Sequence, residues 1–209
     1  MGDIEEMPPV VKERFPETWG QLALFTQFLA DEGEKRGLIG PRELPRLWSR
    51  HILNCTAINE FIPEGATVAD IGSGAGLPGV VLAITRPDVH VTLVEPMERR
   101  IEWLYDVTEA INLEKAWIVR ARAEELHDQD EFQVVTARAV AALDKLMRWT
   151  MPLVADGGKL LALKGERAKE EVDAALKVRR KFKVASTSVV EVPSLVPEES
   201  PTNVVIVER

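Results

Sequence analysis

Apolar and polar residues follow one pattern in the first third of the chain and another in the rest. At residues 19–30 and 47–62 the apolar positions recur at helical spacing, with a stretch rich in glycine and proline between them. Later, short apolar runs typical of buried strands alternate with amphipathic segments. We therefore expect a single domain over residues 1–209, with a small N-terminal helical region at 1–64 and an α/β core at 65–209.

Seven apolar segments of the core are expected to be strands. They lie at residues 67–71, 89–95, 116–121, 132–138, 158–165, 184–192 and 202–208. Amphipathic segments between several of them lie at residues 77–87, 98–111, 143–151 and 166–180. Strands joined by helices are typical of a parallel sheet, whereas the last two strands, with no helix between them, are expected to be antiparallel. The pattern predicts a doubly wound, Rossmann-like α/β sheet, mostly parallel with an antiparallel C-terminal strand.

A glycine-rich loop, DIGSGAGLPG at residues 70–79, joins the first predicted strand to the first helix of the core. Gly74, Gly76 and Gly79 satisfy the G-x-G-x-x-G pattern, in which bare backbone approaches a ligand and presents the amides at a helix N-terminus. Glu95 ends the next predicted strand, where a carboxylate can accept hydrogen bonds from both hydroxyls of a ribose. The combination predicts a nucleoside-containing cofactor.

NAD and S-adenosylmethionine both contain such a ribose, and three features favour S-adenosylmethionine. Asp70, two positions before Gly72, would repel a pyrophosphate but suits the ammonium group of a methionine tail, directly or through water. The chain has no second substrate domain of the kind most dehydrogenases use, and its predicted last strand is antiparallel. We expect Asp70, Gly72, Gly74, Gly76 and Glu95 to bind the cofactor.

Several separated motifs support a family assignment. RHILN precedes the glycine loop, which extends as DIGSGAGLPGVVLAITRPD, and ARAVAAL and LALKGE follow in that order. From about residue 37 to the last strand, the chain closely resembles the bacterial RsmG (GidB) family, which are S-adenosylmethionine-dependent methyltransferases of small-subunit ribosomal RNA. The resemblance implies methylation of N7 of a guanine in the 530 loop of 16S rRNA, with S-adenosylhomocysteine as the second product. Ala137 and Glu95 replace residues common in relatives, serine and aspartate respectively, without changing the expected cofactor.

The resemblance also implies roles for individual residues. Gly72 and Leu77 would contact the cofactor in the loop, and Ala123 and Glu124 of ARAEEL would lie beside the adenine. Arg138 of ARAVAAL, at the end of the fourth strand, is the expected cofactor-binding and catalytic arginine. Guanine N7 has a free lone pair and needs no general base, so we expect Arg138 to position the reactants by pairing with a carboxylate, the cofactor tail or an RNA phosphate.

The formal net charge of −8 excludes a protein that is basic over its whole surface, but it allows local clusters of cations around the cofactor site. We expect Arg50, His51, Arg86 and Lys164 to form a basic rim that contacts RNA phosphates. The basic segment at residues 177–183 is interpreted instead as a solvated helix end.

Three further features bear on the compartment of the protein and on metal binding. The single cysteine fits a reducing compartment, no apolar run is long enough to cross a bilayer, and the histidines His51, His90 and His127 lack metal-ligand spacing. We expect a cytoplasmic monomer without a metal, acting on 16S rRNA or a small ribosomal subunit assembly and not on DNA or a membrane. Two alternatives stay open: a methyltransferase for another RNA or a small molecule, and a binding module without activity.

Overall fold

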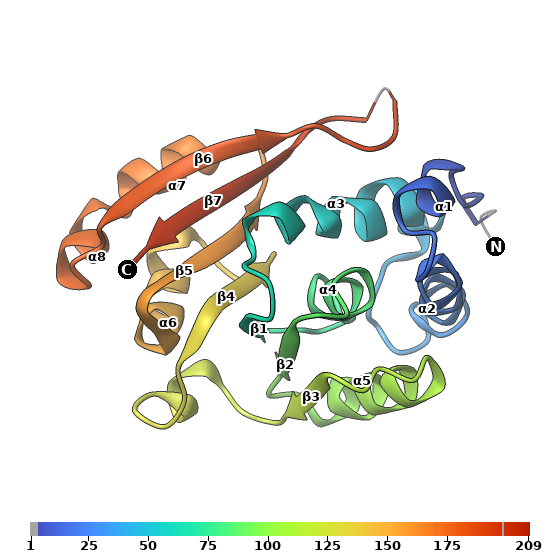
Figure 1. Cartoon of the computed structure of the whole chain (residues 1–209), viewed down its shortest axis with the longest axis horizontal. Coiled ribbons are helices and arrows are strands. Elements are labelled where there is room, and N and C mark those ends of the chain that lie inside the picture. The colour runs from blue at the N-terminus through green and yellow to red at the C-terminus, as the bar shows by residue number, and fades with distance from the viewer. Residues whose placement is uncertain (1–3, 198) are drawn as a thin grey trace.

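A central sheet organises the computed structural model, which describes residues 4–197 and 199–209 (Figure 1). In this part of the chain the sheet has seven strands, in the order β3-β2-β1-β4-β5-β7-β6. The strands are β1 Thr67–Ile71, β2 His90–Val94, β3 Ala116–Val119, β4 Phe132–Arg138, β5 Val154–Lys164, β6 Ser186–Val192 and β7 Thr202–Glu208. β7 is antiparallel to both neighbours, and all other adjacent pairs are parallel. This confirms the predicted mostly parallel sheet with an antiparallel C-terminal strand.

Helices cover both faces of the sheet, as the alternation of side chains along each strand requires. On one face, α4 Gly79–Thr85 and α5 Glu98–Ala110 pack with the N-terminal helices on strand residues such as Val68 and Val91. On the other face, α6 Leu143–Thr150, α7 Ala168–Ala174 and α8 Leu176–Lys181 cover residues such as Ala69. Figure 1 shows these two groups of helices. The predicted helix at 166–180 is divided into α7 and α8.

The N-terminal helical region shares its core with the α/β part. It consists of α1 Val10–Arg14, α2 Trp19–Glu32, the 3-10 turn η1 Pro41–Arg46, the π-helical η2 Leu47–Ile52, α3 Leu53–Cys55 and the 3-10 turn η3 Thr56–Phe61. Buried residues of this region, such as Phe25 and Ile58, belong to the same apolar cluster as Val80 of α4. The segment predicted as a helix at 47–62 is helical up to Phe61, but its hydrogen bonding changes from π to α and then to 3-10 along its length.

None of the helices in the described ranges is long and apolar enough to cross a membrane.

Candidate functional site

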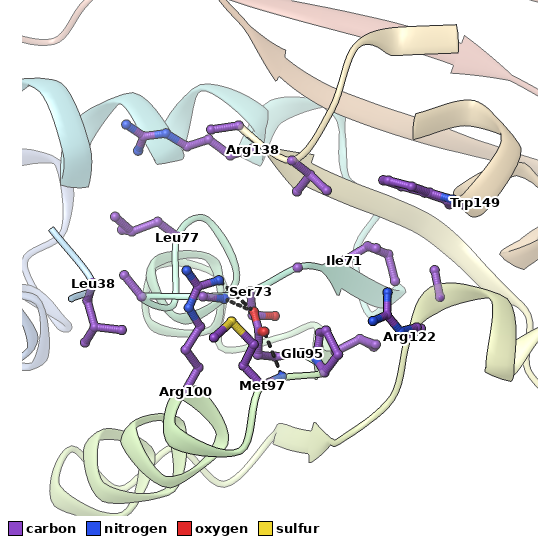
Figure 2. A pocket seen from close by; sticks show the side chains of 18 of the residues that line it. Leu38, Ile71, Ser73, Leu77, Glu95, Met97, Arg100, Arg122, Arg138 and Trp149 are labelled. Carbon is purple, nitrogen blue, oxygen red and sulfur yellow. Dashed lines mark hydrogen bonds and ion pairs between the residues drawn. The ribbon is translucent and has the colours of Figure 1, made fainter. Parts of the chain in front are cut away.

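A cavity of about 640 Å³ opens at the carboxyl ends of β1, β2 and β4 (Figure 2). Ligands of doubly wound sheets bind at this edge, and the volume is typical of sites for small molecules and cofactors. The cavity is lined by Leu38, Ile39, Gly40, Glu43, His51, Ile71, Gly72, Ser73, Gly74, Ala75, Leu77, Val94, Glu95, Pro96, Met97, Arg100, Ala121, Arg122, Ala123, Glu124, Arg138, Ala139, Val140 and Trp149. Most of the predicted cofactor-binding residues therefore line one cavity.

The glycine loop forms the floor of the cavity. Gly72 has φ +74°, and a Cβ atom there would lie 2.9 Å from Cγ2 of Val140, so both the backbone and the available space require glycine. Gly76, with φ +92°, differs in its surroundings, because a Cβ atom there would meet Val80 and Phe25 of the core. The loop thus presents Gly72 and Gly74 to the cavity, whereas Gly76 does not line it and serves to pack the loop on α2 and α4.

Asp70 lies beneath the glycine loop and does not line the cavity, which corrects the expectation that it contacts the cofactor. Its side chain is fully buried, and Oδ2 accepts a hydrogen bond from the backbone N–H of Gly79 at 3.0 Å. Burial raises the pKa of Asp70 to about 7, despite the hydrogen bond from Gly79 that favours the ionised form. The structure therefore assigns Asp70 to supporting the turn from β1 into α4.

Glu95 is buried at the end of β2 and is held in one orientation by three contacts (Figure 2). Oε2 accepts from the N–H of Gly74 at 3.0 Å and lies 3.5 Å from Nη1 of Arg100, and Oε1 accepts from the N–H of Met97 at 3.0 Å. Carboxylate oxygens have more than one lone pair each. Glu95 can thus accept ribose hydroxyls while it remains bound to the loop.

Part of the cavity wall comes from the 3-10 turn η4 Ala123–Leu126, which follows β3. The turn buries Ala123 and leaves Glu124 exposed, and both residues line the cavity. Arg122 and Trp149 also line the cavity, although neither was predicted from the sequence (Figure 2). No local spacing marks Trp149, because it comes from α6 and reaches the cavity only through packing.

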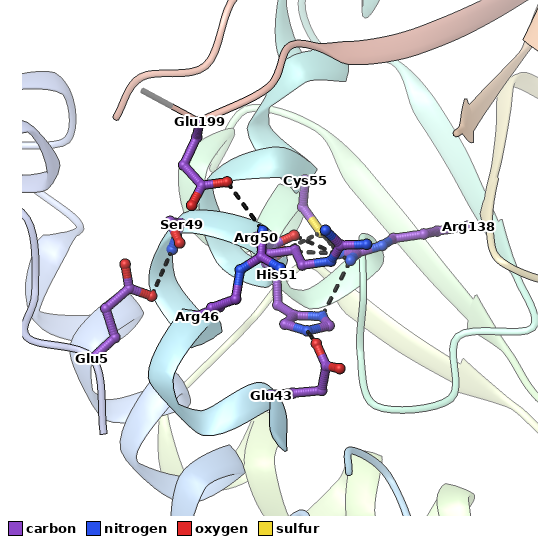
Figure 3. A network of polar contacts seen from close by, with 9 residues as sticks. All are labelled: Glu5, Glu43, Arg46, Ser49, Arg50, His51, Cys55, Arg138 and Glu199. Atoms are coloured by element: carbon purple, nitrogen blue, oxygen red, sulfur yellow. Dashed lines mark hydrogen bonds and ion pairs between the residues drawn. The ribbon is translucent and has the colours of Figure 1, made fainter. Parts of the chain in front are cut away.

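Arg138 lines the cavity, but its guanidinium points toward the segment 50–55 (Figure 3). Nη1 donates to the carbonyl of His51 at 2.9 Å and to Sγ of Cys55 at 3.2 Å. Nη2 donates to the carbonyl of Arg50 at 3.2 Å and faces Nδ1 of His51 at 3.1 Å. The carbonyls belong to the π-helical η2, where the N–H of Leu53 bonds to the carbonyl five residues earlier. A side chain that donates to helix carbonyls competes with the ladder of the helix itself, which explains the irregular hydrogen bonding here.

His51 connects Arg138 to Glu43. Nε2 of His51 lies 2.6 Å from Oε2 of Glu43, while Nδ1 faces the Arg138 donor. Because an arginine only donates, Nδ1 must be the acceptor, and Nε2 carries the proton and donates to Glu43. Burial lowers the pKa of His51 below 6.5, the hydrogen bond to Glu43 opposes this change, and the charge of Arg138 adds to it. The imidazole is therefore neutral at pH 7.

Two of the four residues expected to contact RNA are placed where they cannot form a rim with the others. Arg86 ends α4 at the opposite edge of the sheet, where its guanidinium donates to the carbonyls of Asn59 and Ile62 and pairs with Asp88 at 2.6 Å. Lys164 is at the correct edge, but its side chain is only 9% exposed and pairs with Glu171 at 2.8 Å. Both cations are used inside the protein, which corrects the prediction for them.

Arg50 and His51 do lie at the site. The side chain of Arg50 is exposed beside the cavity and has no ion-pair partner within residues 4–197 and 199–209. His51 is mostly covered and takes part in the network with Glu43 and Arg138. Arg50 thus stays a candidate for a phosphate contact, whereas His51 belongs to the wall of the cavity.

The seven-stranded sheet with its antiparallel β7, together with the glycine loop facing Glu95, is the Rossmann-like fold found in methyltransferases. The family model described as rRNA small subunit methyltransferase G (GidB) matches residues 19–201. The chain belongs to this family, which confirms the resemblance found in its motifs.

Individual proteins agree with this assignment. A protein named ribosomal RNA small subunit methyltransferase G from Beutenbergia cavernae is 53% identical over 171 residues, which cover 82% of this chain and 81% of the relative. The protein of the same name from Corynebacterium glutamicum is 45% identical over 205 residues, covering 97% and 92%. Among solved structures, M. jannaschii TYW2 in complex with AdoMet has the same fold, with a TM-score of 0.59 at 19% identity over 77% of this chain and 76% of that one.

Proposed function

We propose that this protein transfers a methyl group from S-adenosylmethionine to N7 of a guanine in the 530 loop of 16S rRNA. Membership of the rRNA small subunit methyltransferase G family, over residues 19–201, carries the proposal of an rRNA substrate. The substrate is 16S rRNA, free or within a small ribosomal subunit assembly in the cytoplasm. The choice of N7 in the 530 loop follows the resemblance of the sequence motifs to the family.

The residues that line the cavity fit S-adenosylmethionine. Gly72 exposes bare backbone to the cavity, next to Val140. A Cβ atom at this position would lie too close to the Val140 side chain. Glu95 offers carboxylate oxygens to the ribose, and the turn at Ala123 and Glu124 offers a wall for the adenine. When bound, S-adenosylmethionine supplies an electrophilic methyl group on a sulfonium. These residues would hold it at the carboxyl edge of the sheet.

The reaction requires little acid–base chemistry from the protein. The in-plane lone pair of guanine N7 forms the new N–C bond as the S–C bond breaks, and the electron pair of that bond stays on sulfur. The products are S-adenosylhomocysteine and a methylated guanine that carries the positive charge, and no proton leaves N7. The contribution of the enzyme is therefore to hold N7 in line with the methyl group, which can lower the barrier substantially.

Exposed cations next to the cavity support binding of RNA in spite of the net charge of −8. Arg50 and Arg122 are exposed, and Arg122 also lines the cavity. Contacts from such side chains to phosphates position the RNA without reading its sequence. A folded RNA or a ribosomal particle would then be recognised mainly by its shape and backbone.

The test is transfer of a labelled methyl group from S-adenosylmethionine to small ribosomal subunits that lack the modification. Borohydride–aniline treatment, which cleaves at N7-methylguanine, maps the product. We expect one cleavage in the 530 loop with the wild type and with Arg180→Ala, an exposed arginine of α8, and strongly reduced cleavage with Arg138→Ala. Cofactor binding without methylation of this RNA would overturn the proposal, and label in another RNA or a small molecule would favour the alternative substrates.

A further inference from the structure

Three side chains from three separate elements meet at one wall of the cavity (Figure 3). Glu43 comes from η1, His51 from the π-helical η2, and Arg138 from the end of β4. Glu43 and His51 are 2.6 Å apart, His51 and Arg138 are 3.1 Å apart, and all three line the cavity. They form one chain of hydrogen bonds from the turn at residues 41–46 to the sheet.

The terminal donors of Arg138 are fully used by the segment 50–55. Each terminal nitrogen of an arginine carries two hydrogens, and each here has two acceptors in that segment. The guanidinium is consequently directed toward the helical segment and away from Glu95, as Figure 2 shows. This direction matters for the proposed reaction, because positive charge develops on the purine and a free guanidinium near N7 would repel it.

The protonation state of His51 determines whether the hydrogen bond between its Nδ1 and Arg138 can form. Nδ1 accepts from Arg138 only while it has no proton. A proton on Nδ1 replaces the acceptor with a donor and places an imidazolium 3.1 Å from a guanidinium nitrogen. Glu43 favours the required tautomer, because it accepts the hydrogen on Nε2.

We propose that Glu43 and His51 are positioning residues for methyl transfer: neutral His51, oriented by Glu43, anchors Arg138 and fixes the cavity wall formed by residues 38–51. This inference rests on the proposed function. Neither residue touches the transferred atoms in this scheme. Both act through Arg138, so their loss should reduce turnover more than cofactor binding.

The surroundings of His51 give the inference a pH dependence. The titratable and charged groups near it are Glu43 of η1, Arg50 on its own segment, Cys55 of α3 and Arg138 of β4. Burial lowers the pKa of His51, the hydrogen bond to Glu43 raises it, and the charges of Arg138 and Arg50 lower it. Methyl transfer should therefore fall as the pH drops through a pKa below 6.5, where Nδ1 gains a proton and no longer accepts from Arg138.

A matched pair of variants isolates the acceptor at Nδ1. His51→Asn keeps an oxygen near that position for Arg138 and cannot be protonated in this range, whereas His51→Leu has no acceptor. Both lose the contact with Glu43, so they differ only at Arg138. We expect kcat to fall by about 10- to 100-fold in His51→Leu and by no more than about 3-fold in His51→Asn, with little change in cofactor affinity. The acidic fall in activity should be absent in His51→Asn.

Two further variants complete the test. Glu43→Gln keeps an acceptor for Nε2 but removes the charge that raises the pKa of His51, so the acidic fall in kcat should move to lower pH. His90→Gln replaces a histidine that stacks on Trp117, outside the cavity, and should leave the pH profile unchanged. Nitrogen-15 NMR of the imidazole should show the Nε2–H tautomer at pH 7 and its loss on acidification.

The outcomes separate this inference from the proposed function. Equal kcat values for His51→Leu and His51→Asn, or an acidic fall that persists in His51→Asn, would overturn the positioning role while wild-type methylation stands. If the wild type binds S-adenosylmethionine but methylates no RNA, the proposed function fails. The NMR titration then decides independently whether His51 anchors Arg138, and an Nδ1–H tautomer at pH 7 would disprove the anchoring.

Discussion

Replacing Asp70 with asparagine should change how the stability of the protein depends on pH. The Asp70 carboxyl is fully buried, and burial raises its pKa from the ordinary value of 3.8 to about 7. Because the folded state binds this proton more tightly than the unfolded state does, the stability contribution is greatest when the carboxyl is protonated. This contribution to the free energy of unfolding is progressively lost as the pH rises from 3.8 through 7. Asparagine has a similar shape, does not titrate, and can still accept from Gly79.

The size of the effect follows from the two pKa values. Between pH 5 and pH 8, the free energy of unfolding of the wild type should fall by about 2 to 3 kcal/mol relative to that of Asp70→Asn, with most of the change below pH 7. Every other group that titrates in both proteins cancels in this difference. The difference therefore reports on Asp70 itself.

Urea unfolding of both proteins at pH 5, 6, 7 and 8 provides the measurement. Equal m-values confirm that the same surface is exposed in each case. If the two stability curves run parallel across this range, Asp70 is ionised throughout in the folded protein and the reasoning from burial is refuted.

Three other substitutions test the site and its support. Gly72→Ala should raise the dissociation constant of S-adenosylmethionine at least about tenfold, because alanine is strained at φ +74° and its Cβ displaces Val140; calorimetric titration showing unchanged affinity would contradict this. Lys164→Met should reduce the free energy of unfolding by about 1 to 2 kcal/mol, because Glu171 loses its cation but still accepts from the N–H of Leu143; urea unfolding measures this change, and an unchanged midpoint would show that the pair contributes little. Arg50→Ala should weaken RNA binding and lower the slope of log affinity against log salt by about 1, whereas an identical slope would remove Arg50 from the RNA contacts.

Much of the fold follows from the sequence alone, because its signals are local. Strand residues such as Val68 and Val91 belong to short apolar runs, and the helices between them have their own periodicity. The glycine loop is marked by its composition, and Glu95 by its place at the end of the next strand. Parallel strands joined by helices bring their carboxyl ends to one edge, so these two features had to meet.

The position of Arg86 could also have been derived from the sequence. A helix that starts at the carboxyl edge of a parallel sheet runs back toward the opposite edge, and Arg86 lies just beyond the last residue of α4. The distance of Arg86 from the cavity thus follows from the order and direction of β1 and α4. The amino-acid composition around Arg86 does not indicate this distance.

The tertiary structure alone decided the direction of individual side chains and their partners. Asp70 and Ile71 are neighbours in β1, yet Ile71 lines the cavity while Asp70 lies under the loop, because successive strand residues point to opposite faces. Lys164 lies at the expected edge, but its ammonium group forms an ion pair with Glu171, seven residues later. Whether a polar group faces a ligand or a partner inside the protein depends on packing that no local pattern records.

The network around Arg138 shows the same limit over a longer distance. Arg138 and His51 are 87 residues apart, and their contact exists because β4 ends beside the π-helical segment. The sequence alone determined the sheet, the glycine loop and the family to which the chain belongs, since these depend on composition and spacing within short segments. Only the tertiary structure placed the anchor of Arg138, since hydrogen bonds between distant segments depend on angstrom-scale geometry that the whole fold sets.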